Sequence, residues 1–158
     1  RQRQMCIRDR FIISDNSANN HLYDFLGRDF INERLWNLGL NSTRIRHRLS
    51  IRLSDEENRF THPINFYDKS KIIYKQDSQI ASMPLELNVK DYKIGEYHIL
   101  EGEKKDGPLN FSTKNFMNLP EQHELLKRII FPKNYAKEEQ FSLSESDYQF
   151  LYLSLIHI

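Results

Sequence analysis

The order of apolar and polar residues divides the chain into three blocks, and the first block predicts two short helices. Apolar side chains recur at helical spacing over about 17–27 and again over about 30–38. Gly27 and Gly39 follow these stretches at the position where a left-handed glycine commonly ends a helix. Asp29 stands where its carboxylate could cap the second helix. The apolar positions are Leu22, Phe25 and Leu26 in the first stretch and Phe30, Ile31, Leu35 and Leu38 in the second.

The second block, about 41–110, has the pattern of extended chain. Residues of opposite polarity alternate from Thr43 to Ser54, which predicts a half-buried strand. A hairpin follows, with strands INFYD and KIIYKQ joined by a turn at residues 68–70. The rest of the block is weakly patterned and interrupted by glycine and proline, so we expect loops and short strands there.

The third block returns to helical spacing and predicts helices over about 120–131 and 145–152. Pro120 fits the first turn of the earlier helix, and Pro132 would end it. Ser144 and Asp147 have the spacing of a capping box at the start of the last helix. The apolar side of the earlier helix would consist of Leu125, Leu126, Ile129 and Ile130. Two helical blocks on either side of an extended block, within 158 residues, predict one α+β domain.

Several charged and aromatic residues allow both a functional and a structural interpretation. The arginines of the predicted strand would share one face, which could bind an anion or nucleic acid but is more simply a solvated face beside three acidic residues, 55–57. His47 is interpreted as a hydrogen-bonded structural histidine, and Trp36 as a core residue. His123-Glu124 lacks the second histidine of a zinc motif, so no metal site is predicted. The four arginines are Arg44, Arg46, Arg48 and Arg52.

Both ends of the chain look foreign to the domain. Residues 1–10 and about 153–158 resemble translated sequencing-adapter sequence, and we set them aside. Residues 1–10 carry four arginines, one aspartate and the single cysteine, so without them the net charge falls from +1 to −2. A nearly neutral, cysteine-free body gives no argument for nucleic-acid binding, thiol catalysis or disulfides. No apolar run is long enough to span a membrane.

Ser14-Asp15-Asn16, directly before the first predicted helix, is the strongest candidate for chemistry. A serine hydroxyl needs a neighbouring base, or it can relay a proton between two groups. A carboxamide offers both a donor and an acceptor, so Asn16 could bind a substrate amide. A short aspartate can accept hydrogen bonds from nearby backbone amides and hold such a loop rigid. The alternative is that the triplet only caps a helix.

The triplet and its context, ISDNSANNHLYDFLG followed by DFINERLWNLGLNSTRIRHR, resemble the helical subdomain of the serine β-lactamase and penicillin-binding-protein family. THPINFYD, NFSTKNFMNLPEQHELLKRIIFP and DYQFLY further resemble β-lactamase-related serine hydrolases of Bacteroidetes-type bacteria. The resemblance covers about residues 11–152. It implies a fragment of the β-lactamase/transpeptidase-like fold, mainly the helical subdomain plus an extended and hairpin insert.

The resemblance implies a role for each residue of the triplet. Ser14 would be the proton relay, Asn16 would bind the amide of the substrate's acyl side chain, and Asp15 would hold the loop. The other two family motifs, S-x-x-K with the nucleophile and K-T-G, do not occur in the chain, and Lys105-Asp106-Gly107 is the nearest look-alike. The nucleophile would then lie upstream of residue 11 and the K-T-G strand downstream of residue 152, so this chain alone would be inactive.

The family's deacylating glutamate has no counterpart at the expected offset after Thr43-Arg44, although Glu57 could substitute on a different loop path. The resemblance implies a β-lactam, a peptidoglycan peptide or a related amide or ester as substrate, a periplasmic or cell-envelope location, and no cofactor. A non-catalytic module of the same fold that binds cell-wall peptide is the alternative.

Overall fold

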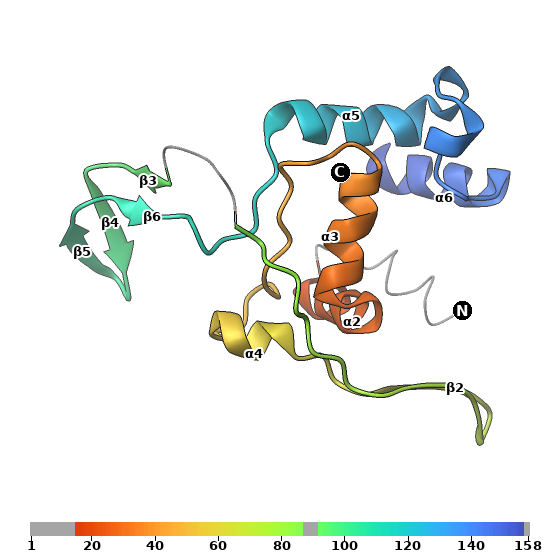
Figure 1. Cartoon of the computed structure of the whole chain (residues 1–158), viewed down its shortest axis with the longest axis horizontal. Helices are drawn as coiled ribbons and strands as arrows, with labels where there is room; N and C mark the ends of the chain where they lie inside the picture. Colours follow the sequence, from red (N-terminus) through yellow and green to blue (C-terminus); the bar gives the residue numbers. More distant parts are fainter. Residues whose placement is uncertain (1–14, 87–91, 157–158) are drawn as a thin grey trace.

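The computed structural model describes residues 15–86 and 92–156. Within them, helices and short antiparallel strand pairs confirm the α+β class (Figure 1). The α-helices are α2 (Asn16–Leu26), α3 (Arg28–Asn37), α4 (Asp55–Arg59), α5 (Leu119–Ile130) and α6 (Glu145–Ile156), with short 3-10 turns η1 (Pro132–Asn134) and η2 (Lys137–Glu139). The strands are β1 (Ile64–Asp68), β2 (Lys71–Gln76), β3 (Lys93–Ile94), β4 (Tyr97–Leu100), β5 (Glu103–Asp106) and β6 (Leu109–Asn110).

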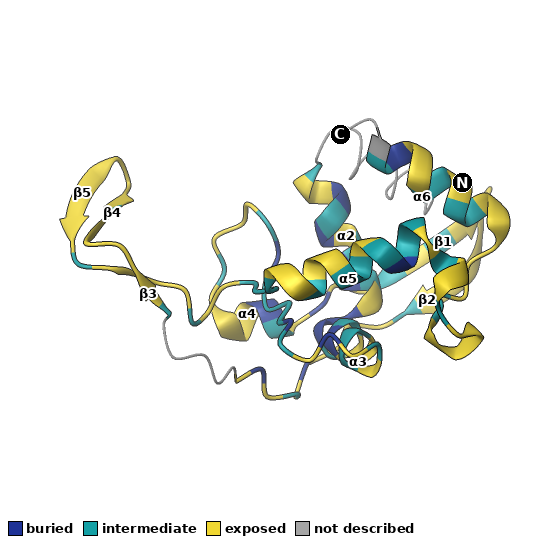
Figure 2. Cartoon of the chain, turned by 90° about the horizontal axis from the view of Figure 1, so that it is seen from above, coloured by how far each residue is buried: buried dark blue, intermediate teal, exposed yellow. Residues whose placement is uncertain are grey.

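The described strands form three separate two-stranded antiparallel pairs, β1–β2, β3–β6 and β4–β5. The β1–β2 pair has the strand boundaries predicted from the sequence, with a bulge between Phe66 and Tyr67. The two larger hairpins reach out on opposite sides of the helical body (Figure 1), and most of their surface is exposed (Figure 2). The β1–β2 hairpin is tied back to α2 by ring contacts of Phe25 with Phe66 and Tyr74, at centroid distances of 5.4 and 6.1 Å.

Helices α2 and α3 meet at Gly27, whose φ of 79° is a conformation that glycine adopts without steric cost. Asp15 caps α2, with its carboxylate accepting a hydrogen bond from the Ser17 amide at 2.8 Å. The prediction that Asp29 caps α3 is wrong, because α3 begins directly after Gly27 and has no side-chain cap. Asp29 instead accepts hydrogen bonds from the amides of Ser82 and Met83, which fastens α3 to the segment after β2.

The prediction of a half-buried strand over 43–54 is also wrong. Arg44 forms one isolated bridge with Phe116, and no residue from 45 to 54 lies in a strand. The backbone of this segment has no neighbouring strand to pair with. Asparagine side chains from other segments supply its hydrogen bonds instead. A carboxamide carries the same donor and acceptor groups as a peptide unit, so it can replace one.

Four asparagines make these contacts, and we call them the asparagine clamp: Asn20 of α2, Asn32 of α3, Asn58 of α4 and Asn115. Asn32 and Asn20 each bind both polar groups of one residue. Asn32 accepts from the Ile45 amide and donates to the Ile45 carbonyl, both at 2.8 Å. Asn20 accepts from the Leu49 amide at 2.8 Å and donates to its carbonyl at 2.9 Å.

The other two members bind the residues in between. Asn115 accepts from the amides of Arg46 at 2.7 Å and His47 at 3.0 Å, and donates to the His47 carbonyl at 3.0 Å. Asn58 accepts from the Arg48 amide at 3.0 Å. Every backbone amide from residue 45 to 49 therefore has an asparagine partner, and we call these five residues the clamped segment.

Tyr23 lies at the centre of this arrangement and is 3% exposed. Its hydroxyl lies 3.0 Å from the Arg46 carbonyl and 2.8 Å from the Asn58 carbonyl, and its single proton can be donated to either. Burial raises the pKa of this phenol to about 12, against a lowering by the nearby cations Arg28 and Arg48.

The apolar interior is small. Among the described residues, the buried apolar side chains are Ala18, Tyr23, Leu40, Ala81 and Leu85. The predicted apolar stripes are only partly covered, with Leu26 39%, Phe30 50% and Leu126 42% exposed. The described part therefore presents apolar helix faces without a covering layer.

Helices α5 and α6 begin as the sequence predicts. Pro120 lies in the first turn of α5, and Ser144 and Asp147 form the reciprocal capping box of α6, with bonds of 3.1 and 3.2 Å. Glu121 joins α5 to the residues just before the clamped segment by accepting from the Ser42 amide and the Thr43 hydroxyl, at 2.8 and 2.6 Å. Helix α6 continues to residue 156, within the stretch interpreted as adapter, and that interpretation stays a prediction.

Replacing Asn32 by alanine should disrupt the clamp. Asn32 is fully buried, and its loss would leave the amide and carbonyl of Ile45 without partners. We expect a loss of about 2–4 kcal/mol in unfolding free energy, since each unsatisfied buried group costs about 1–3 kcal/mol. Urea unfolding can be followed by Trp36, the single tryptophan, whose indole donates to the Thr43 carbonyl at 2.8 Å. Asn37→Ala, at an exposed position on the same helix, should change stability by less than about 0.5 kcal/mol; equal effects of the two variants would contradict the role of the clamp.

The raised pKa of Tyr23 predicts a loss of stability at high pH. The unfolded chain releases the phenolic proton near pH 10, whereas the folded chain holds it to about 12. The free energy of unfolding should therefore fall as the pH rises from about 10 to 12. Urea unfolding of Tyr23→Phe should show a smaller alkaline loss and, at neutral pH, a deficit of about 1 kcal/mol for the missing hydrogen bond. Tyr67→Phe, at a 54% exposed tyrosine, is the control, and an alkaline loss unchanged in Tyr23→Phe would disprove the assignment.

Candidate functional site

A hollow of about 690 Å³ lies beside the first turns of α2, between that helix, the end of the clamped segment and the residues that enter β1. Its lining residues come from three separate parts of the chain. The lining residues are Asn16, Ser17, Asn20, His21 and Asp24 of α2, Arg48, Leu49, Ser50, Ile51 and Leu53 of the clamped segment and its continuation, and His62, Pro63 and Ile64.

Of the three triplet residues, Asn16 lines this hollow, Asp15 precedes it without lining it, and Ser14 lies outside the described residues. Asp15 is the N-cap of α2 and holds the start of the helix through the Ser17 amide. Asn16 is the first residue of α2, is exposed and lines the hollow. Its carboxamide donates from Nδ2 to the Ser50 hydroxyl at 2.7 Å. The helix therefore presents Asn16 across the hollow toward a serine 34 residues away in the sequence.

The floor of the hollow contains a buried ion pair. The Arg48 guanidinium, 3% exposed, pairs with the Asp24 carboxylate and donates to the Phe60 carbonyl at 2.6 Å. Arg48 also lies over the Tyr23 ring, 5.0 Å from its centroid. The exposed His62 approaches the same carboxylate, with Nδ1 3.4 Å from Asp24 Oδ2. The charges of Arg48 and Asp24 are thus matched to each other.

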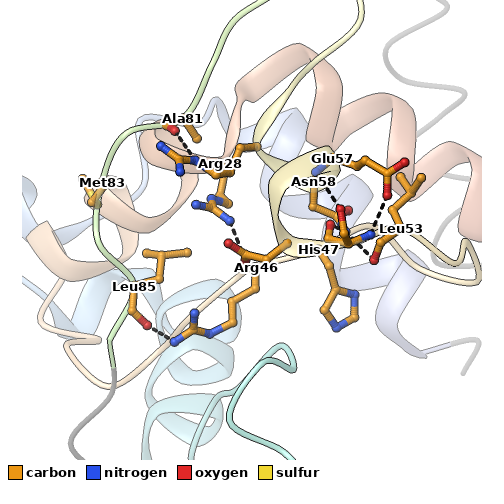
Figure 3. A network of polar contacts seen from close by, with 12 residues as sticks. Arg28, Arg46, His47, Leu53, Glu57, Asn58, Ala81, Met83 and Leu85 are labelled. Carbon is orange, nitrogen blue, oxygen red and sulfur yellow. Dashed lines mark hydrogen bonds and ion pairs between the residues drawn. The ribbon is translucent and has the colours of Figure 1, made fainter.

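This pair corrects the interpretation of the four arginines as one solvated face. Arg46 is partly buried and donates to the Leu85 carbonyl (Figure 3), and burial lowers the pKa of its guanidinium. Arg44 lies 4.4 Å over the Trp36 ring and donates to the Asn41 carbonyl at 2.7 Å. Arg52 is exposed and pairs with Glu101. Without a strand these side chains do not share a face, and three of them serve as donors to backbone or buried carboxylate.

Glu57 occupies a capping position at α4. Its carboxylate accepts from the Ser54 amide at 2.7 Å, and the Ser54 hydroxyl accepts from the Glu57 amide at 3.1 Å. Hydrogen bonds from the Ser54 backbone and hydroxyl lower the pKa of this carboxyl, which makes it a weaker proton acceptor. Figure 3 shows Glu57 beside Asn58 and Leu53. Glu57 is not among the residues that line the hollow, and its role as a deacylation base stays a prediction.

His47 has the hydrogen bonds of a structural histidine. Its Nε2 accepts from the Asn115 amide at 3.3 Å, and Nδ1 lies 2.6 Å from the Arg48 carbonyl, to which it can donate. One donating and one accepting nitrogen correspond to the neutral tautomer. Residues 15–86 and 92–156 contain no group of three or more histidine, cysteine or acidic side chains that could hold a metal ion.

Sequence reasoning missed three contributors to the hollow: Ser50, the Asp24–Arg48 pair and His62. They come from segments that are separated in the sequence and meet only through the clamp, so no local motif marks them. No helix in the described part of the chain is long and apolar enough to cross a membrane.

Comparison with known proteins identifies the family. The model of the Beta-lactamase enzyme family matches residues 3–85, more than half of the chain. The match includes the triplet, α2, α3, the asparagine-clamped segment and the β1–β2 hairpin, and it begins within the ten residues interpreted as adapter. No curated protein and no solved structure gives a significant match. The chain belongs to the Beta-lactamase enzyme family, with the serine-hydrolase character that this membership suggests.

Proposed function

We propose that this chain is the central part of a serine hydrolase that acylates its active-site serine with a β-lactam, a D-alanyl peptide or a related amide or ester. In this proposal Ser14 relays a proton, Asp15 holds the loop, and Asn16 binds the amide of the substrate's acyl side chain. The nucleophile and the K-T-G strand belong to other parts of the parent protein. The parent is of the Bacteroidetes type and works in the periplasm or cell envelope.

One observation carries the proposal: Asn16 is fixed at the rim of an open hollow by a capped helix. The Asp15 cap fixes the first turn of α2, and the adjacent carboxamide faces the hollow from that turn. A rigidly held carboxamide is suited to gripping a substrate amide, because the cost of orienting it has been met in folding. An apolar wall of Leu49, Ile51 and Ile64 could accommodate the adjoining part of an acyl side chain.

The partly covered helix faces also support the proposal. Phe30 and Leu26 are 50% and 39% exposed, and Leu119 of α5 is 75% exposed. Large exposed apolar surfaces on a soluble protein mark an interface. Additional helices and a sheet of the parent would cover these faces, and the chain's lack of S-x-x-K and K-T-G agrees with further parts of the parent supplying the chemistry.

The hollow favours acylation over rapid hydrolysis of the acyl-enzyme. Among the described residues that line it, Asp24 is the single carboxylate, and Asp24 is paired with Arg48. Hydrolysis of an acyl-serine needs a base that activates water. Asp24 and the capped Glu57 are both engaged in other contacts, and the exposed His21 and His62 are the remaining lining side chains that could act as a base. Because the described lining offers no free carboxylate, we expect a long-lived acyl-enzyme and acyl transfer to a peptide or ester acceptor in preference to antibiotic hydrolysis.

Covalent labelling with a fluorescent penicillin tests the proposal. The full-length parent should be labelled in a denaturing gel, and the label should persist because deacylation is slow. The 158-residue chain should stay unlabelled, because it contains no S-x-x-K serine. Labelling of the 158-residue chain would refute the fragment interpretation, and fast loss of label from the parent would refute the slow-hydrolysis expectation.

A non-catalytic module of the same fold that binds cell-wall peptide is the second candidate, since Asn16 and the hollow could hold such a peptide without a nucleophile. It would use the same hollow and the same asparagine, and it would bind a D-alanyl peptide reversibly. The parent would then contain no S-x-x-K upstream of residue 11 and would not be labelled. The complete reading frame and the same gel therefore separate the two candidates.

A further inference from the structure

Ser50 combines an unusual backbone conformation with a contact to the proposed substrate-binding residue. Its φ of 55° lies in the left-handed region, which serine adopts at some steric cost. Its hydroxyl accepts the hydrogen bond from Asn16 Nδ2 at 2.7 Å, and both residues line the hollow. A left-handed serine at a candidate site points to a role beyond connecting two segments of the chain.

The stability of the loop does not explain the left-handed conformation of Ser50. Leu49, the preceding residue, is already fixed through both of its backbone groups by the buried Asn20. The bond between Asn16 and Ser50 joins two exposed residues. Such a bond contributes little to folding, because water competes for both partners. Its main physical effect is on the carboxamide of Asn16, which would otherwise rotate freely in solvent.

We infer that Ser50 is a positioning residue that orients the Asn16 carboxamide for substrate. With Nδ2 bound to the Ser50 hydroxyl, the planar amide holds Oδ1 on the opposite side, and no described residue donates to that oxygen. Oδ1 and the second hydrogen of Nδ2 are then held in one orientation, in which they can bind the N–H or the carbonyl of a substrate amide. The inference rests on the proposed role of Asn16, and it adds to that role a second residue, Ser50, which sets the orientation in which the carboxamide meets the substrate amide.

The left-handed conformation of Ser50 fits this role. The Asn20 contact fixes the chain at Leu49, and the turn at residue 50 places the hydroxyl within 2.7 Å of Asn16. Glycine accepts a φ of 55° without steric cost but has no hydroxyl. Ser50→Gly therefore removes the hydrogen bond while preserving the backbone, which separates the positioning role from a structural one.

Acylation of the full-length parent by two penicillins tests the inference. Benzylpenicillin has the secondary amide, and 6-aminopenicillanic acid has a primary amine in its place. The readout is the ratio of the second-order acylation rate constants for the two compounds. Asn16→Ala and Ser50→Gly should each lower this ratio about tenfold, which corresponds to one oriented hydrogen bond of about 1.4 kcal/mol. The double variant should lower it no further, because both changes act on one contact.

The controls distinguish the possible failures. Ser70→Ala changes an exposed serine in the β1–β2 turn and should leave the ratio unchanged. Ser50→Ala provides a second deletion of the hydroxyl, and thermal unfolding midpoints show that each variant folds. A ratio lowered by Asn16→Ala but kept by both Ser50 variants would overturn the inference and leave the proposed function intact. A ratio unchanged in Asn16→Ala, or no acylation of the parent, would overturn the proposed function together with the inference.

Discussion

The pairing of asparagine side chains with the backbone of residues 45–49 is the constraint on which the rest of the structure depends. Four carboxamides from α2, α3, α4 and the loop before α5 converge on five consecutive residues. A strand would receive these hydrogen bonds from a neighbouring strand, whereas here they come from three helices and a loop. The segment thereby joins elements that make few apolar contacts with one another.

This constraint explains how a small apolar interior can hold a defined site. Hydrophobic burial is non-directional, and five buried apolar residues cannot by themselves fix the path of a loop. Hydrogen bonds from planar amides are directional, and an unsatisfied buried partner is costly, so each one specifies a position along the chain. Tyr23 and the Asp24–Arg48 pair add further directional contacts to the same segment, and Glu121 adds one to Thr43 just before it. The interior is specified mainly by polar complementarity.

The elements that could be predicted from the sequence are those whose determinants lie close together in it. The β1–β2 hairpin, the capping box of α6 and the glycine at the end of α2 depend on residues a few positions apart, and their positions agree with the patterns. The alternation over 43–54 was equally regular, yet it does not encode a partner strand. Asn32 and Asn115 lie 13 and 68 to 69 residues from the backbone groups they bind, beyond any local pattern.

The candidate site likewise contains some residues that the sequence predicted and others that it did not. Asp15 and Asn16 were predicted as site residues because the triplet is contiguous, and the residues matched by the family model include them. Ser50, Asp24 and His62 were not found, since only the folded path of the clamped segment brings them to the first turns of α2. The arginines were misread for the same reason: their surroundings depend on tertiary contacts with Leu85, Trp36 and Asp24 and not on their spacing.

The internal neutralisation of Arg48 has a consequence for ligands that carry a carboxylate. Among the described lining residues Arg48 is the single arginine or lysine, and its charge is committed to Asp24. Penicillins and peptides with a free C-terminus are anions, and their carboxylates need a cationic anchor. If the proposed function holds, this hollow would contact the neutral half of such a molecule, and its negative end would be recognised by a cationic group in another part of the parent protein.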